Sequence, residues 1–225
     1  MKKLIKKAFI ATLPVLTGYL VLGFGFGIIL RSTGFSVLMA FAMSLFIYAG
    51  SMQYVAIDLF TGGASYLTVA LTTLMVNARH LFYGISMLDK YRGTGAKKAY
   101  LMYTLTDETY SLVCGELSGV QETDRSLYYL LVSLMDHIYW VTGSVLGAIA
   151  GGVLPFSTEG IDFALTALFL TVFTEQWLSA RDRRPALIGV AASALCLVIF
   201  GSESFLIPAM LVIALTLTVI KEAKP

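Results

Sequence analysis

Residues 65–88 read SYLTVALTTLMVNARHLFYGISML. The run is apolar and long enough to span a bilayer, since about twenty apolar residues make a membrane-spanning helix. It nevertheless carries Asn77, Arg79 and His80 near its middle. An arginine at that depth costs roughly 2.5–3.5 kcal/mol on insertion scales. We therefore expect Arg79 to face protein or water rather than lipid.

The composition of the whole chain is typical of a membrane protein. Of its 225 residues, 57% are hydrophobic and 13% are charged, whereas soluble domains carry about 25% charged residues. The mean hydropathy is +0.80. The net charge of +2 comes from short basic clusters, which leave no broad cationic face for nucleic acid. These values exclude a soluble domain and a nucleic-acid-binding protein.

Eight apolar segments follow one another with short loops between them. They cover residues 8–30, 37–60, 65–88, 99–117, 127–151, 161–179, 185–201 and 203–220. We therefore predict an all-α polytopic protein in a lipid bilayer, with one transmembrane domain over residues 1–225. Cys114 and Cys196 lie in apolar runs, where cysteine behaves as a small hydrophobe, so we expect no metal and no cofactor.

Basic clusters predict the orientation of the chain, because lysine and arginine favour the cytoplasmic side of short loops. The clusters lie at residues 2–7, 90–98, 181–184 and 221–224. We expect all four, and both termini, to be cytoplasmic. However, three apolar segments separate the first cluster from the second, and three more separate the second from the third. A chain that crossed at every segment would place successive clusters on opposite sides.

One segment in each group of three should therefore enter the membrane and return, as a re-entrant or broken helix. Irregular backbone is tolerated at membrane depth where it is buried in protein or lines a cavity. In the first group we favour residues 37–60, which Gly50 interrupts. In the second group we favour residues 161–179.

A faint internal repeat suggests two related halves. A Thr-Gly pair precedes a glycine-rich run at residues 17–18 and again at residues 142–143. A Leu-Phe pair precedes a glutamine at residues 45–46 and again at residues 168–169. In the topology above, residues 8–30 run outward and residues 127–151 run inward. Residues 8–88 and 127–220 would then be inverted copies joined by a helix over 99–117, an arrangement common among secondary transporters.

Segment 99–117 is the most polar of the eight. At helical spacing its polar residues fall on one face, which carries Tyr100, Tyr103, Thr104, Asp107, Ser111 and Cys114. Asp107 and Glu108 lie at its midpoint. These acids either neutralise Arg79 as a structural pair or form a site for a proton or a substrate.

Segment 127–151 places Asp136 and His137 near mid-depth. They share a face with Ser133 and Trp140 and with small residues that allow close helix approach, namely Ser144, Gly147 and Gly151. Asp136 and His137 either exchange a proton or are satisfied polar groups in the core.

The residues at mid-depth include three acids and one arginine. Histidine with its ordinary pKa is neutral at pH 7, so the two histidines do not balance the charge of the acids. Transfer out of water disfavours the charged form of a carboxyl group. At least one acid should therefore carry a proton that it can exchange, as coupling to a proton gradient requires. The expected proton-coupling residues are Asp107, Glu108, His80, Asp136 and His137.

A guanidinium matches a carboxylate in geometry, so Arg79 either binds a substrate carboxylate or pairs permanently with an acid. The break at Gly50 offers backbone amides beside a side-chain amide, which can hold a carboxylate or an ammonium group. Trp140 can receive an apolar side chain. The expected substrate-binding residues are Gly50, Ser51, Gln53, Asn77, Arg79 and Trp140.

The chain resembles the AzlC family of azaleucine-resistance or branched-chain amino acid permease proteins. The resemblance covers essentially the whole length and rests on YAGSMQ at 48–53, VNARH at 76–80 and LTDET at 105–109. It implies the large subunit of an exporter of leucine, isoleucine and valine in the bacterial cytoplasmic (inner) membrane. A small AzlD-like membrane subunit is the implied partner. Protons are the expected energy source, because the chain has no GxxxxGK[ST] loop for ATP.

Two other functions are compatible with the sequence. The first is a passive channel or a structural subunit in which the buried charges only orient helices. The second is an intramembrane enzyme, but the chain contains neither an HExxH zinc motif nor a GxSxG nucleophile elbow. We therefore expect no enzyme activity.

Overall fold

The fold is taken from a computed structural model that describes residues 1–115, 117, 119–153, 163, 170, 173–174, 177–178, 180 and 182–222. Among these residues the only regular structure is helical, as predicted. The elements are α1 (Lys2–Ser32), α2 (Val37–Phe46), α3 (Gly50–Thr61), α4 (Tyr66–Val76), α5 (Ala78–Met87), α6 (Lys97–Tyr103), α7 (Asp107–Val113), η1 (Glu122–Asp124), α8 (Arg125–Val153), α10 (Arg184–Ser204) and α11 (Leu206–Glu222).

The chain divides into two compact units, Met1–Leu165 and Thr166–Pro225. In the second unit, α10 and α11 pack against each other. α10 bends at Gly201, whose φ of 73° is readily adopted only by a residue without Cβ. All of the predicted site residues lie in the first unit.

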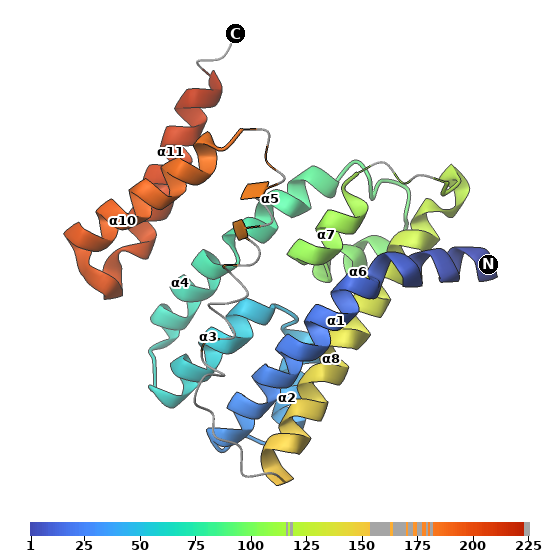
Figure 1. Ribbon diagram of the computed structural model, residues 1–225, viewed down its shortest axis with the longest axis horizontal. Helices are drawn as coiled ribbons and strands as arrows, with labels where there is room; N and C mark the ends of the chain where they lie inside the picture. The colour runs from blue at the N-terminus through green and yellow to red at the C-terminus, as the bar shows by residue number, and fades with distance from the viewer. Residues whose placement is uncertain are drawn as a thin grey trace. The chain divides into compact units, whose positions relative to one another are not determined.

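Glycines let α1 and α8 lie in close contact over most of their length (Figure 1). A Cβ added to Gly147 would overlap the carbonyl oxygen of Phe24, and one added to Gly27 would overlap that of Ser144. The buried face of α8 carries Ser133, Asp136, His137, Trp140, Ser144 and Gly147. The prediction of a shared face with small residues for close packing is therefore confirmed.

α1 and α8 run in the same direction. Successive contact pairs along the two helices are Tyr19 with Gly143, Phe24 with Gly147 and Ile28 with Gly151. The prediction that residues 8–30 and 127–151 run in opposite directions is therefore wrong. The inverted repeat of residues 8–88 and 127–220, which depended on that direction, is not confirmed. The shared words are short and apolar, and such words recur by composition alone.

Segment 37–60 is broken close to the predicted position. The break covers residues 47–49, between α2 and α3, and Tyr48 adopts a φ of 44° there. The rings of Phe35 and Phe60, at the two ends of the segment, lie 6.0 Å apart between centroids. α2 and α3 therefore form a hairpin whose ends meet, as a returning element requires.

Segment 99–117 is a second hairpin, so the prediction of one continuous helix is wrong. α7 begins afresh after Thr106, whose Oγ1 accepts the N–H of Thr109 at 3.3 Å. Lys90, which precedes α6, donates a hydrogen bond of 2.9 Å to the carbonyl of Gly115, which follows α7. The polar residues of the segment therefore do not share one helix face, because an N-cap interrupts the helical repeat.

The two hairpins start at opposite ends of the α1–α8 pair, and their tips meet between those ends. α2 follows the C-terminal end of α1. α6 starts near the N-terminal end of α8, where Lys97 Nζ lies 3.4 Å from Ser126 Oγ. At the tips, Tyr103 Oη donates a hydrogen bond of 2.5 Å to the carbonyl of Leu45.

Segment 65–88 is also interrupted, because Asn77 separates α4 from α5 with φ of −96° and ψ of 4°. The two helices continue in the same general direction (Figure 1), so this segment differs from the hairpins. The predicted return at residues 161–179 lies mostly outside the described residues. With α6 and α7 as the returning element, the basic clusters no longer require it.

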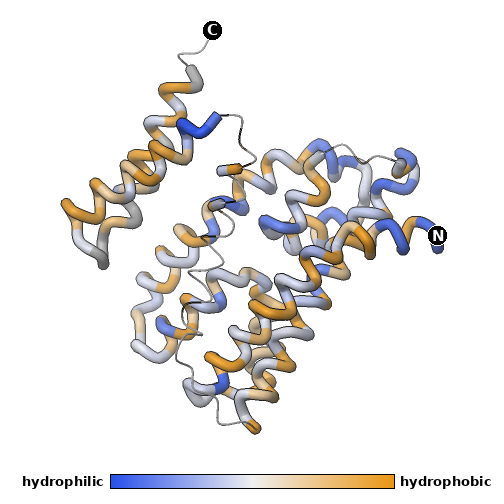
Figure 2. The backbone as a smooth tube through the Cα atoms, viewed as in Figure 1, coloured by the Kyte–Doolittle hydropathy of each residue, from blue (hydrophilic) through white to orange (hydrophobic). Residues whose placement is uncertain are grey.

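Apolar side chains face outward on the long helices, as expected of surfaces that contact lipid. Val21 on α1 is 72% exposed and Val198 on α10 is 85% exposed. In the first unit, polar residues gather at the end that carries the N-terminus (Figure 2). Within the part of the chain that the structure describes, three helices are long and apolar enough to cross a membrane, Lys2–Ser32, Glu122–Val153 and Arg184–Gly201.

We predict that Gly27→Ala destabilises the protein, whereas Gly18→Ala on the same helix does not. The added Cβ at Gly27 meets the backbone of α8, and at Gly18 it meets nothing within 4 Å. Overpacking costs roughly 1–3 kcal/mol, while alanine in an open helix position is favoured over glycine by up to about 1 kcal/mol. Thermal unfolding in detergent checks this, and equal midpoints for both variants would contradict the close packing.

Candidate functional site

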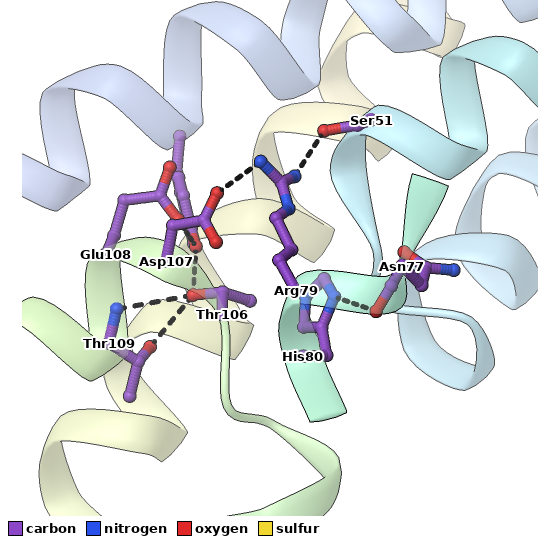
Figure 3. Close-up of polar contacts among 9 residues, drawn as sticks. Ser51, Asn77, Arg79, His80, Thr106, Asp107, Glu108 and Thr109 are labelled. Atoms are coloured by element: carbon purple, nitrogen blue, oxygen red, sulfur yellow. Dashed lines mark hydrogen bonds and ion pairs between the residues drawn. The ribbon is translucent and has the colours of Figure 1, made fainter. Parts of the chain in front are cut away.

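Three helix starts meet around the guanidinium of Arg79 (Figure 3). Arg79 lies in the first turn of α5, Ser51 in that of α3 and Asp107 in that of α7. Arg79 Nη1 lies 2.7 Å from Asp107 Oδ2, and Arg79 Nη2 donates a hydrogen bond of 2.8 Å to Ser51 Oγ. We call these three residues the arginine bridge.

The arginine bridge is not fully buried. The side chain of Arg79 is 31% exposed and that of Asp107 is 19% exposed. The sequence left open whether Arg79 binds a substrate or pairs with an acid, and the structure pairs it with Asp107. Because both charges keep some exposure, a polar ligand can still approach them.

Helix geometry favours acids at the start of α7. The first N–H groups of a helix have no partner within the helix, and that end carries a partial positive charge. Asp107 and Glu108 occupy the first turn of α7, where this charge stabilises carboxylates. Arg79 then adds a full positive charge on the side of Asp107.

A row of hydroxyl groups joins Glu108 to Asp136. Tyr19 Oη donates to Glu108 Oε2 at 2.8 Å and lies 2.7 Å from Thr106 Oγ1. Thr106 Oγ1 donates to Thr109 Oγ1 at 3.2 Å, and Thr109 Oγ1 donates to Asp136 Oδ2 at 2.7 Å. We call these five residues the hydroxyl chain.

Sequence reasoning did not select the three hydroxyl residues of this chain. Thr106 and Thr109 flank the two acids at the spacing of a helix N-cap, which is a signal that could have found them. Tyr19 lies in an apolar run 87 residues before Thr106, and nothing in the sequence relates the two.

Asn77 and His80 lie beside Arg79 (Figure 3). His80 Nδ1 is 3.3 Å from the carbonyl oxygen of Asn77. The side-chain oxygen of Asn77 is buried and has no hydrogen-bond partner among the residues that the structure describes. Asn77 therefore offers an acceptor next to the arginine bridge.

Gln53 and Trp140 are buried and hydrogen-bonded to each other rather than open to the arginine bridge. Trp140 Nε1 donates to Gln53 Oε1 at 2.8 Å, and Gln53 Nε2 donates to Ser44 Oγ at 3.1 Å. A Cβ on Gly50 would lie 3.0 Å from the Trp140 ring. These residues hold the tip of the α2–α3 hairpin against α8.

His137 is not brought to the arginine bridge. Its Nδ1 lies 3.1 Å from Tyr100 Oη, and its ring centroid is 4.2 Å from that of Tyr48. Asp136, the preceding residue, is fully buried and accepts a hydrogen bond from Thr109 at the end of the hydroxyl chain. Over the described residues, no group of three His, Cys, Asp or Glu side chains is placed to hold a metal ion.

Comparisons with known proteins agree with the resemblance seen in the sequence. The family model described as AzlC protein matches residues 14–154. The "Branched-chain amino acid transport protein AzlC" of Bacillus subtilis is 44% identical over 96% of this chain and 85% of that protein. An "Uncharacterized membrane protein" of Helicobacter pylori strain J99 is 39% identical over 98% of this chain and 96% of that protein. The "Inner membrane protein YgaZ" of Escherichia coli is 28% identical over 80% of this chain and 75% of that protein. No solved structure matches.

We predict that Arg79 and Asp107 stabilise each other measurably. In a double-mutant cycle with Arg79→Gln and Asp107→Asn, the coupling energy should be roughly 0.5–3 kcal/mol, as for residues in direct contact. The control pair is Arg125 and Glu122, which lie 3.3 Å apart with side chains 47% and 86% exposed. Exposed pairs contribute about 0–1 kcal/mol.

Unfolding in detergent measures both cycles. Additive effects of Arg79→Gln and Asp107→Asn would contradict the ion pair.

Proposed function

The chain belongs to the AzlC family, and on that premise we propose that it is a membrane transporter that exports branched-chain amino acids in exchange for protons. Family membership supports transport rather than catalysis. The named relative from Bacillus subtilis supports leucine, isoleucine and valine as substrates. The direction of transport and the coupling to protons are our proposals.

The arginine bridge is the observation that carries this proposal. An amino acid is a zwitterion, and Arg79 and Asp107 offer one charge of each sign 2.7 Å apart. The guanidinium can bind the substrate carboxylate through two N–H groups, and Asp107 can accept from the ammonium group. The substrate then separates Arg79 from Asp107 and becomes the partner of both. Its binding is therefore coupled to the contacts between α3, α5 and α7.

Interrupted helices support the same function. Transporters commonly place substrate sites where membrane helices are discontinuous, with helix N-termini facing an anionic group. Here α3 and α5 both begin at the arginine bridge, at Gly50 and Ala78. The buried amide oxygen of Asn77 adds an acceptor for an ammonium group.

The acids supply the proton site in this proposal. The described part of the site holds Asp107, Glu108 and Asp136 near one arginine. Arg79 compensates Asp107, so Glu108 and Asp136 remain to exchange protons. Taking up a proton from outside while releasing an amino acid would use the proton gradient for export.

If both hairpins enter the membrane and return, a single topology is consistent with cytoplasmic basic clusters. With the N-terminal lysines in the cytoplasm, α1 leads outward, α2–α3 returns from outside and α4–α5 leads inward. α6–α7 then returns from inside, and α8 leads outward. We propose this orientation in the bacterial cytoplasmic membrane, with both termini inside and with a small AzlD-like subunit as partner.

We predict that Glu108→Gln and Asp136→Asn uncouple proton movement from leucine transport while the protein still inserts into membranes. Each change replaces a carboxyl group that can exchange a proton by an amide of about the same size. The measurement is leucine counterflow across a pH step in proteoliposomes, with and without the small subunit. Asp58→Asn removes an exposed carboxylate of α3 and should leave coupling unchanged.

The same assay on the wild-type protein tests the proposed transport function. Leucine accumulation that follows the pH step supports an exporter. Its absence with and without the subunit would remove that assignment, and unsaturable flux that ignores pH would indicate a passive channel.

The topology makes a separate prediction for single cysteines in a variant that lacks Cys114 and Cys196. Lys3→Cys and Lys97→Cys should react with an impermeant reagent from the cytoplasmic side, and Thr33→Cys and Tyr66→Cys from the outside. All four residues are exposed. Reaction of Lys97→Cys and Tyr66→Cys from the same side would contradict the topology.

A further inference from the structure

The hydroxyl chain contains more oxygen contacts than its hydroxyl groups can supply with protons. Four contacts join Glu108, Tyr19, Thr106, Thr109 and Asp136, at 2.8, 2.7, 3.2 and 2.7 Å. Each contact needs one proton between its two oxygens. The three hydroxyl groups bring three protons. A fully bonded chain therefore needs a fourth proton, and only a carboxyl group at one of its ends can hold it.

That fourth proton has two possible places, and each place sets one donor direction along the whole chain. With the proton on Glu108, every hydroxyl donates toward Asp136, which is then the carboxylate. With the proton on Asp136, every hydroxyl donates toward Glu108. Both arrangements satisfy all four contacts, so a fully bonded chain can hold its fourth proton at either end.

We infer that the hydroxyl chain is a proton relay, in which Tyr19, Thr106 and Thr109 pass the coupling proton between Glu108 and Asp136. Glu108 gives its proton to Tyr19, Tyr19 gives its own to Thr106, Thr106 to Thr109, and Thr109 to Asp136. Each hydroxyl ends with one proton, and Asp136 gains the one that Glu108 lost. The inference rests on the proton coupling proposed above and names the residues that would perform it.

Burial supports transfer along the side chains themselves. Tyr19, Thr106, Thr109 and Asp136 are all buried, so bulk water does not reach the contacts between them. The relay also connects separate elements, since Tyr19 lies on α1, Thr106 and Thr109 at the start of α7 and Asp136 on α8. Movement of the α6–α7 hairpin would therefore make or break it.

The position of Glu108 links the relay to the substrate site. Its neighbour Asp107 pairs with Arg79, so the charge on Glu108 acts on the arginine bridge across a short distance. Other titratable groups near the relay include Tyr48 at the tip of α2–α3, Tyr83 on α5, and Tyr128 and His137 on α8. His137 contacts Tyr100 and belongs to no contact of the relay.

The test compares two fluxes of the reconstituted protein, with its small subunit if transport needs it. One is the proton flux that a leucine gradient drives, followed with a pH-sensitive dye. The other is exchange of labelled for unlabelled leucine, which moves no net proton. Tyr19→Phe removes the hydroxyl but keeps the ring, whose centroid lies 5.4 Å from that of Trp140. The matched control is Tyr139→Phe, which removes a hydroxyl 3.2 Å from Thr12 Oγ1 outside the relay.

We expect Tyr19→Phe to lower the leucine-driven proton flux at least about ten-fold, as loss of a proton-transfer group does, with exchange lowered less than two-fold. Tyr139→Phe should change neither flux. Thr109→Val should behave like Tyr19→Phe, and Thr109→Ser, which keeps the hydroxyl, should restore the proton flux.

Wild-type proton flux in both Tyr19→Phe and Thr109→Val would overturn the relay and leave the proposed transport function intact. An equal loss of both fluxes in Tyr19→Phe, or equal effects of Thr109→Val and Thr109→Ser, would overturn it too, because the hydroxyl would then not be what matters. No leucine-driven proton flux in the wild-type protein would instead overturn the proposed proton coupling, and the relay with it.

Discussion

A positive charge inside an apolar segment needs a partner, and the partner of Arg79 determines how the first unit is built. Its guanidinium joins α5 to Asp107 on α7 and to Ser51 on α3. Those two helices belong to hairpins that start at opposite ends of the α1–α8 pair. The Arg79 side chain therefore connects the tips of the two hairpins, α2–α3 and α6–α7, to the break between α4 and α5.

The interrupted helices and the arginine bridge depend on each other. A helix start in the middle of a membrane exposes N–H groups that lipid cannot satisfy, so such breaks persist only where protein or ligand covers them. At the start of α7, Thr106 Oγ1 accepts the N–H of Thr109, and the acids of the first turn, Asp107 and Glu108, stabilise the positive end of the helix. The glycine-lined contact of α1 with α8 brings the two long helices close together, and the hydrogen bond of Trp140 with Gln53 attaches the α2–α3 hairpin to α8.

Features encoded locally could be predicted from the sequence. Arg79, Asp107 and Glu108 were identifiable because charges in apolar segments are costly, and Gly50 marked the first break because glycine interrupts a strongly apolar helix. The hairpin at residues 99–117 was not predictable in the same way. Hydropathy reports composition and not chain direction, and the spacing of Tyr100, Thr104 and Asp107 also fits an unbroken helix. Contacts distant in sequence, such as that of Tyr19 with Thr106, leave no pattern in a single chain.

The most direct test of this account is an electron cryomicroscopy map of the protein in lipid nanodiscs, with its small subunit if required, recorded with and without leucine. We expect the guanidinium of Arg79 at the middle of the lipid layer, between Asp107 and Ser51 without leucine and against the substrate carboxylate with it. A continuous helix through residues 104–106, or an Arg79 side chain that reaches the headgroups, would contradict the central claim.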